Sequence, residues 1–408
     1  MKTLFFTNEY PPNVYGGAGI HVEYLTKELS KRCSVEVRCF GVRPPDGNED
    51  GAIRVKAYDS DKNAFSNAPE ELRSPLKSVD KAVKFNIDPV SADIVHCHTW
   101  YTHLAGVMCR LLYGTPLVVT THSLEPLRPW KRDQLGRGYD FSSWAERYTL
   151  ENADGVIAVS EGTKKDILDN FSISADKIKV IPNGIDVDEY KPEDGTKEAA
   201  DLGLDPDKPF VMFVGRVTRQ KGITHLINAL KYMDPDIQAL FCAGAPDTPA
   251  IAEEVRRAYE SGAAGRKVVW IEKMLSKKSL IKLYSKAAVF CCPSIYEPFG
   301  IINLEAMACG TPVVSGDLGG MREIIIEGVT GVKVPVAQSK EPPFEPLEPD
   351  AFSHSMANAV NMLCKDEDRR KKMGKAARKR AVDGYSWKSI AENVHSYYQE
   401  IIECRKKN

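Results

Sequence analysis

Short apolar runs alternate with longer stretches of helical periodicity along most of the chain. The apolar runs have the length of buried strands, and many are bounded by Gly, Pro, Asn or Asp. Strands that alternate with helices form mostly parallel sheets with helices on both faces. The predicted strands comprise residues 3–7, 34–40, 53–57, 93–97, 117–121, 155–159, 178–181, 210–214, 238–243, 267–270, 288–292, 312–315 and 331–334.

A turn-rich segment divides this pattern into two series. Pro, Asn, Gly and Asp are concentrated between residues 182 and 209, as in a connection between domains. A chain of 408 residues is also too long for one ordinary core. We therefore predict an α/β protein with two doubly wound, Rossmann-like domains, at 1–190 and 191–385, followed by a C-terminal helix at 386–408.

Two other segments have distinct patterns. In the C-terminal segment, apolar residues recur at helical spacing and form one stripe, which predicts a helix with one buried face. The stretch 42–78 is instead interrupted by Pro, Gly, Asn and Asp. It is predicted to be mostly loop apart from the strand at 53–57.

Composition and charge narrow the class of protein. Apolar residues make up 43% of the chain and charged residues 27%, which are the proportions of a globular protein. A net charge of −1 argues against binding nucleic acid by charge alone. No apolar run reaches the length of a membrane span, and the apolar core of residues 1–7 is too short for a signal peptide. Ten scattered cysteines without a C-x-x-C pair indicate free thiols in a reducing compartment, so we expect a cytoplasmic protein.

The stretch 297–310 joins two predicted strands through a turn and a short helix. Glu297 lies in the turn, Phe299-Gly300-Ile301 leads into the helix, and Glu305 lies one to two turns inside it. A helix N-terminus exposes unpaired N–H groups and a positive dipole end, which suit an anion such as a diphosphate. Two carboxylates beside such an anion are available to hold hydroxyl groups.

Two cations follow the predicted strand at 210–214. Arg216 and Lys221 lie in a loop bracketed by glycines, where they would neutralise charge on a leaving diphosphate. The alternative is a solvated basic loop. Paired carboxylates also occur in glycosidases, but a hydrolase of neutral glycosides needs no such cations.

Glycines follow the first predicted strand and open a helix. Gly16, Gly17 and Gly19 leave room for the backbone to approach a pyrophosphate closely. The match to a dinucleotide-binding fingerprint is poor, because the loop is long and no third glycine follows at the expected place. A plain turn and helix cap is the alternative interpretation.

Several histidines lie at predicted strand ends. His96, His98 and His103 suggest a metal site, but no carboxylate or cysteine pair completes the spacing. A structural or substrate-binding role is therefore favoured for them. His122 lies between a buried strand and a polar loop and is the better candidate for contact with substrate, with a structural histidine as the alternative.

Together these motifs resemble those of the retaining glycosyltransferases with two Rossmann-like domains (GT-B), in the glycogen and starch synthase group. Glu297 and Glu305, with seven residues between them, match the signature of that group. Arg216 and Lys221, the Gly-rich first loop and residues 319–323 are similar to its other motifs. The resemblance extends over the whole chain.

Two long stretches resemble a narrower group. Residues 9–19 and 121–132 look like those of the short actinobacterial-type glycogen synthases. That group includes enzymes that make maltose 1-phosphate from ADP-glucose and glucose 1-phosphate. Val14 and Thr99 depart from the larger bacterial glycogen synthases, which have Lys and Asp there, so contacts to phosphate and acceptor are expected to differ.

The resemblance implies an architecture and an activity. The two domains would face each other across a cleft, with the last helix crossing back to the first domain. The enzyme would move glucose from ADP-glucose, or from UDP-glucose, to the end of glycogen or another α-1,4-glucan or to glucose 1-phosphate. It would retain the anomeric configuration and need no cofactor or metal.

The resemblance also implies roles for residues. Glu305 would hold the ribose, Glu297 the donor sugar, and Arg216 with Lys221 the departing diphosphate. His122 would lie beside the reacting sugar. The expected catalytic residues are His122, Arg216, Lys221 and Glu297, and the expected donor-binding residues also include Gly16, Gly17, Gly19, Phe299, Gly300, Ile301 and Glu305.

Three cations shortly after His122 favour an acceptor that carries a phosphate. An uncharged glucan end has no use for Arg128, Lys131 and Arg132, whereas the phosphate of glucose 1-phosphate does. A solvated loop with ion pairs to neighbouring carboxylates is the alternative. With Tyr15 and His122, these cations form the expected acceptor site.

Other functions remain open at this point. A related transferase could use another phosphorylated acceptor, as sucrose-phosphate and mycothiol-pathway enzymes do. A noncatalytic sugar-binding protein on the same fold and a metal-dependent transferase are further alternatives. The sequence does not decide whether the donor carries ADP or UDP, or whether the acceptor is a glucan or glucose 1-phosphate. It also gives no indication of the oligomeric state.

Overall fold

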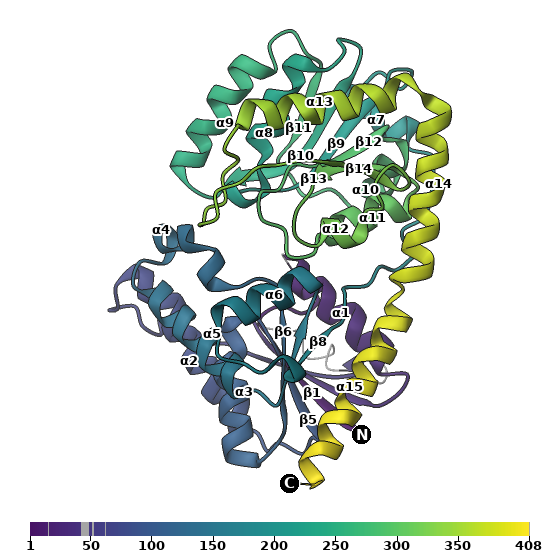
Figure 1. Ribbon diagram of the computed structural model, residues 1–408. Coiled ribbons are helices and arrows are strands. Elements are labelled where there is room, and N and C mark those ends of the chain that lie inside the picture. Colours follow the sequence, from purple (N-terminus) through teal and green to yellow (C-terminus); the bar gives the residue numbers. More distant parts are fainter. Residues whose placement is uncertain (15, 42–48, 51–52, 62, 408) are drawn as a thin grey trace. The chain divides into compact units, whose positions relative to one another are not determined.

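The chain divides into two units, one of which is built from two distant stretches (Figure 1). The computed structural model describes residues 1–14, 16–41, 49–50, 53–61 and 63–407. The first unit comprises Met1–Gly184 and Trp387–Asn408, and the second comprises Ile185–Ser386. The break comes a few residues before the boundary predicted after residue 190. The Ile185 N–H donates to the Tyr385 carbonyl, which ties this segment to the second unit.

The first unit contains a parallel sheet with one short antiparallel strand at its edge. The described strands run in the order β3-β4-β2-β1-β5-β6-β7-β8, and only the β3–β4 pair is antiparallel. The strands are β1 (Lys2–Thr7), β2 (Ser34–Phe40), β3 (Glu49–Asp50), β4 (Ile53–Tyr58), β5 (Ile94–His98), β6 (Leu117–Thr121), β7 (Gly155–Ala158) and β8 (Ile178–Val180).

Helices cover both faces of this sheet because successive strand side chains point to opposite faces. Phe5 packs with α1 (Gly17–Leu29) and α15 (Trp387–Lys407), which lie side by side in Figure 1. Leu4 and Phe6 pack in a second core with α2 (Glu70–Ile87) and α3 (Trp100–Tyr113). The other described helices of more than one turn are α4 (Arg132–Leu135), α5 (Gly138–Asn152) and α6 (Glu161–Asn170).

The second unit contains a wholly parallel sheet among its described residues. The strand order is β11-β10-β9-β12-β13-β14. The strands are β9 (Phe210–Val217), β10 (Gln238–Pro246), β11 (Val268–Ile271), β12 (Val289–Cys292), β13 (Val313–Gly316) and β14 (Gly331–Val334). The helices are α7 (Thr196–Asp201), α8 (Ile223–Ala229), α9 (Pro249–Gly262), α10 (Lys277–Lys286), α11 (Ile301–Ala308), α12 (Met321–Ile324), α13 (Pro349–Lys365) and α14 (Glu367–Gly384).

Each sheet has a point at which the strand order reverses. In the first unit, β1 is followed by β2 on one side while β5 lies on the other. In the second unit, β9 is followed by β10 on one side while β12 lies on the other. Loops that leave two such strands at their carboxyl ends diverge and open a crevice for ligands. The residues of interest are therefore expected after β1, β5, β9 and β12.

The predicted fold class, two doubly wound Rossmann-like units, is confirmed. The predicted strands all occur, with ends shifted by a few residues. The prediction of loop for residues 42–78 is wrong at its end, because α2 begins at Glu70. The sequence did not indicate this helix because it contains Pro75, which usually interrupts a helix, and because its residues are mostly polar.

Two further expectations concern cysteines and membranes. All ten cysteines are free, as predicted, and most are buried. Among the described residues, no helix combines the length and the apolar character needed to cross a membrane.

Candidate functional site

A buried ion pair joins the loops that follow β9 and β12. The Lys221 ammonium lies 2.6 Å from Oε2 of Glu297, whose side chain is only 7% exposed. The Ser294 hydroxyl donates to the same carboxylate oxygen at 3.0 Å. Two of the predicted catalytic residues, one cation and one carboxylate, are therefore held together at the strand-order reversal of the second unit.

Glycines allow these loops to approach so closely. Gly222 has a φ of +59°, and a Cβ there would lie 2.2 Å from the Pro293 carbonyl oxygen. Gly319 and Gly320 bring a third loop against the same turn, and the Gly320 N–H donates to the Glu297 carbonyl at 2.9 Å. A Cβ at Gly319 would lie 2.0 Å from that carbonyl oxygen. The turn at Glu297 is thus enclosed by backbone on two sides.

The turn leads into the N-terminus of α11. Gly300 precedes the helix with a φ of +94°, a conformation that favours glycine, and no side chain caps the helix there. Phe299 is buried, whereas Ile301 is partly exposed at the first helical position. The amides of the first turn and the positive end of the helix dipole are therefore available to an anion.

The cations of the β9 loop differ in their surroundings. Arg216 is exposed, and its guanidinium makes no ion pair with any described residue. Arg219 is instead bound to Glu254 and Glu345. The charge of Arg216 is therefore not balanced by any described carboxylate, unlike those of Arg219 and Lys221.

Glu305 lies inside α11 and is held by two tyrosines. Its Oε2 accepts from the Tyr284 hydroxyl at 2.9 Å and its Oε1 from the Tyr190 hydroxyl at 3.3 Å. Burial raises the pKa of Glu305, although both hydrogen bonds oppose that shift. Each carboxylate oxygen keeps a further acceptor position, so a ligand hydroxyl can still be bound.

The first unit has a cavity of about 420 Å³, including its opening to solvent. It lies at the ends of β5 and β6 and along the segment that follows β6. Predicted site residues His122, Arg128 and Lys131 line it, together with Thr99, His103 and Glu146.

The three predicted acceptor-binding cations are not equivalent. Lys131, with 14% of its side chain exposed, lies 2.6 Å from Oε1 of Glu125, and its pKa is lowered by burial and by nearby Arg128. The Arg128 Nη1 donates to the Ser123 hydroxyl at 2.8 Å, while its Nε is buried and has no hydrogen-bond partner in the described part of the chain. Arg132 points elsewhere and pairs with exposed Asp140, so it does not line the cavity.

Glu146 is a cavity residue that the sequence analysis missed. Its Oε2 accepts from the Glu125 N–H at 2.7 Å. Burial, followed by the charge of Glu125, raises the pKa of Glu146 to about 8. The sequence around Glu146 resembles any polar helix position, because only the tertiary fold brings Glu146 beside Glu125.

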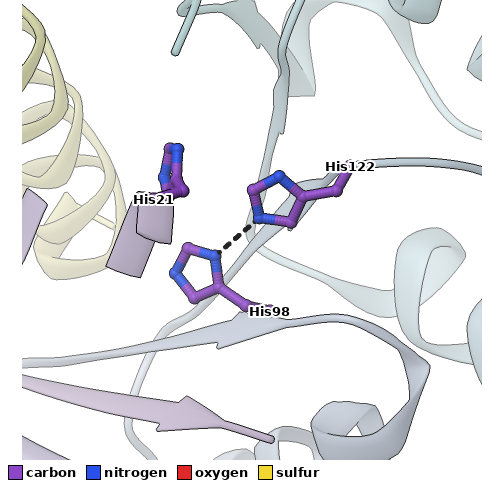
Figure 2. A group of neighbouring side chains, drawn as sticks. All are labelled: His21, His98 and His122. Carbon is purple, nitrogen blue, oxygen red and sulfur yellow. Dashed lines mark hydrogen bonds between the residues drawn. The ribbon is translucent and has the colours of Figure 1, made fainter. Parts of the chain in front are cut away.

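The ring of His122 lies in a group of histidines (Figure 2). Its Nε2 is 3.1 Å from Nδ1 of His98, at the end of β5, and His21 of α1 packs edge-on against it. Burial lowers the pKa of all three rings, so each is neutral at pH 7. His96, also considered as a metal ligand, instead bonds Tyr398 and Thr120, a structural role. His103 lies in α3 and lines the cavity.

The glycine loop after β1 holds a carboxylate of the protein itself. The Gly16 N–H donates to Oε2 of Glu9 at 2.8 Å, and a Cβ at Gly19 would lie 2.8 Å from the same side chain. Gly17 is the first residue of α1. Glu9 thus lies where an anion would meet this helix, a residue that its position just before the glycines could have indicated. Tyr15, predicted at the acceptor, lies outside the described residues.

Comparison with known proteins agrees with this arrangement. The family model described as Glycosyltransferase Family 4 matches residues 15–189, and the model described as Glycosyl transferases group 1 matches residues 194–342. The structure is similar to a sucrose-phosphate synthase from Thermosynechococcus elongatus, with a TM-score of 0.78 at 24% identity over 99% of this chain and 100% of that one. It is also similar to the catalytic domain of starch synthase IV from Arabidopsis thaliana, with a TM-score of 0.75 at 19% identity over 98% and 99% of the two chains.

Two relatives have higher sequence identity to this chain than those two structures have. An alpha-maltose-1-phosphate synthase from Mycolicibacterium smegmatis is 45% identical over 98% of this chain and 100% of its own length. One from Mycobacterium tuberculosis is 40% identical over the same shares.

Fold, family models and relatives together define the class, and the chain is a GT-B glycosyltransferase. Within that class it belongs to the family of the alpha-maltose-1-phosphate synthases. The predicted family and the predicted enzyme class, a hexosyltransferase, are confirmed.

Replacing Gly222 by alanine is expected to separate the two loops that carry Lys221 and Glu297. The left-handed backbone alone costs an alanine about 1–2 kcal/mol, and the added Cβ also meets the Pro293 carbonyl. Misplacing the ion pair by about 1 Å should lower transferase kcat on the order of 10²-fold. Steady-state kinetics and urea unfolding measure the two effects.

Gly265→Ala is the matched control. Gly265 has a φ of +72°, but nothing lies within 4 Å of the position that its Cβ would take. This variant should lose stability through the backbone alone and keep its kcat. If both variants lose activity equally, the contact at Pro293 does not position the site.

Proposed function

We propose that this enzyme transfers a glucosyl group from a nucleoside diphosphate glucose to glucose 1-phosphate, with retention of the α configuration. The observation that carries this proposal is the cavity in which Arg128 and Lys131 lie beside His122. Cations in a sugar-binding cavity suit a phosphorylated acceptor, and a neutral glucan end does not need them. The relatives named alpha-maltose-1-phosphate synthases support the same acceptor class.

The donor is assigned to the second unit. Its diphosphate would lie at the N-terminus of α11, with Arg216 and Lys221 as cations. Glu297 would accept hydrogen bonds from hydroxyls of the donor glucose, and Glu305 from those of the ribose. ADP-glucose is the proposed donor, and UDP-glucose is the alternative because both nucleotides share these diphosphate contacts.

In the proposed reaction, the bond between C1 of the donor glucose and the diphosphate oxygen breaks. A hydroxyl oxygen of the acceptor forms the new bond to C1 on the same face, and its proton passes to the departing phosphate oxygen. His122 would lie beside the positive charge that develops at C1. The side chains supply the positive charge for the leaving group, so no divalent metal is required.

A donor-by-acceptor assay tests this function. ADP-glucose and UDP-glucose are each offered with glucose 1-phosphate, glycogen and a hexose 6-phosphate, and the anomer of each product is determined by NMR. The expected product is α-maltose 1-phosphate, formed fastest from ADP-glucose. A clear preference for glycogen or for the hexose 6-phosphate would overturn the proposed acceptor, and a β product would overturn retention.

Arg128→Ala is expected to weaken the phosphorylated acceptor selectively. The variant loses a partly buried guanidinium that lines the cavity, so KM for glucose 1-phosphate should rise about tenfold or more, as loss of a charge-assisted hydrogen bond does. Any transfer to glycogen should change little. Arg132→Ala is the control because Arg132 faces Asp140 outside the cavity. Equal loss with both acceptors would contradict a role for Arg128 in phosphate binding.

Arg216→Ala is expected to slow the chemical step. Removing one preorganised group that stabilises the transition state typically lowers kcat by about 10²–10³, and exposed, unpaired Arg216 contributes little to folding. Arg219→Ala should keep kcat within a few-fold, since Arg219 already neutralises two glutamates.

Wild-type activity should also persist in EDTA. Loss in EDTA that Mg²⁺ or Mn²⁺ restores would show a required metal.

A further inference from the structure

Three histidine side chains from three separate segments of the first unit lie close together (Figure 2). His21 comes from α1, His98 ends β5, and His122 directly follows β6. One ligand nitrogen from each ring lies within 4.8 Å of the other two. The distance between Nδ1 of His98 and Nε2 of His122 is 3.1 Å. Two nitrogens on a tetrahedral zinc ion are separated by about 3.3 Å, given Zn–N bonds of about 2.0–2.1 Å.

The charge state of these rings suits a metal ion. Burial lowers the pKa of His21 to about 4 and those of His98 and His122 well below the ordinary value. All three rings are therefore neutral near pH 7, and each carries one nitrogen lone pair. Neutral imidazole is the form that binds metals, so no proton has to be displaced at high cost.

One ring is also fixed in the orientation that a ligand needs. Oδ1 of Asn183 lies 2.6 Å from Nδ1 of His21. An amide oxygen only accepts, so Nδ1 of His21 carries the proton and Nε2 carries the lone pair. That Nε2 is buried and has no hydrogen-bond partner among the described residues. Metal-bound histidines are typically held in this way, with the second ring nitrogen donating to an oxygen.

We propose that His21, His98 and His122 form a binding site for one divalent ion of the zinc class. Three histidines with an open fourth position are a known zinc-binding set. His122 also lines the cavity, which gives the ion a path and gives water access to the fourth position. Binding requires the His21 ring to move closer to the other two and the proton shared by His98 and His122 to leave their contact.

Metal binding has a consequence for transfer, and this part rests on the proposed function. An ion on Nε2 of His122 fixes that ring and places positive charge where the acceptor glucose and the reacting C1 would lie. The ion would therefore inhibit the enzyme rather than assist it. An inhibitory site is consistent with catalysis that needs no metal.

Titration with Co²⁺ tests the site without reference to activity. The protein is first treated with EDTA and carries Cys404→Ser, because Cys404 is an exposed free thiol. We expect one equivalent of Co²⁺ to produce the visible absorption of a four-coordinate ion, and Zn²⁺ to displace it. His98→Gln and His21→Gln should abolish this absorption. His354→Gln and His395→Gln, on α13 and α15, are the controls and should keep it.

Other outcomes overturn the proposal. Absence of the four-coordinate spectrum in the Cys404→Ser protein, or its persistence in both His98→Gln and His21→Gln, shows that the trio is only a packed histidine cluster. Asn183→Ala provides a variant that leaves the three ligands in place. It should raise Kd for Co²⁺ about 10–100-fold, the usual effect of losing such a partner, and an unchanged Kd would contradict the orientation argued for His21.

Inhibition is measured separately in the glucose 1-phosphate assay. The Zn²⁺ concentration that halves the rate should match the Kd for Zn²⁺ obtained by competition with Co²⁺. A bound ion that leaves the rate unchanged would overturn the inhibitory role while the site stands. If the enzyme makes no maltose 1-phosphate at all, the proposed function fails, and the Co²⁺ spectrum still decides whether the ion binds.

Discussion

The second unit depends on a charge pair that water barely reaches. Lys221 and Glu297 are both largely buried, and an ion taken out of water is stable only with an oppositely charged or hydrogen-bonding partner beside it. That requirement brings the loop after β9 into contact with the turn after β12. Because the two strands are neighbours in the sheet, the contact needs only small groups at Gly222 and Gly319. The exposed Arg216 and the uncapped end of α11 lie in these same two loops, and under the proposed function both would contact the donor diphosphate.

In the first unit, the carboxyl ends of the strands carry histidines instead of a lysine–glutamate pair. At the ends of β5 and β6 this unit places neutral imidazoles, since burial keeps His21, His98 and His122 unprotonated. Two cations follow β6 in the chain: Lys131 is balanced by Glu125, and Arg128 keeps one nitrogen without a hydrogen-bond partner among the described residues. The cavity is thus lined by these cations together with the neutral ring of His122. Such a lining fits the phosphorylated acceptor of the proposed function.

The sequence predicted the sheets and the position of most site residues, because parallel strands collect their following residues at one edge. It did not predict the direction of individual side chains. Arg128 and Arg132 are close in sequence, yet only Arg128 lines the cavity. Glu9 precedes the glycines by a few residues and could have been identified from its position. Glu146 meets Glu125 only through the packing of α5, so local pattern could not identify it. The helix α2 was missed for a local reason, the proline within it.

The first unit is completed by α15, and this has a consequence for the order of folding during synthesis. The ribosome makes residues 1–184 first, but α15 follows only after the whole second unit. Until then His96 lacks the Tyr398 hydroxyl, and the apolar face that α1 shares with α15 is open to water. The second unit is continuous in sequence and can close as soon as it leaves the ribosome. The half of the enzyme that is translated first is therefore the half that finishes folding last.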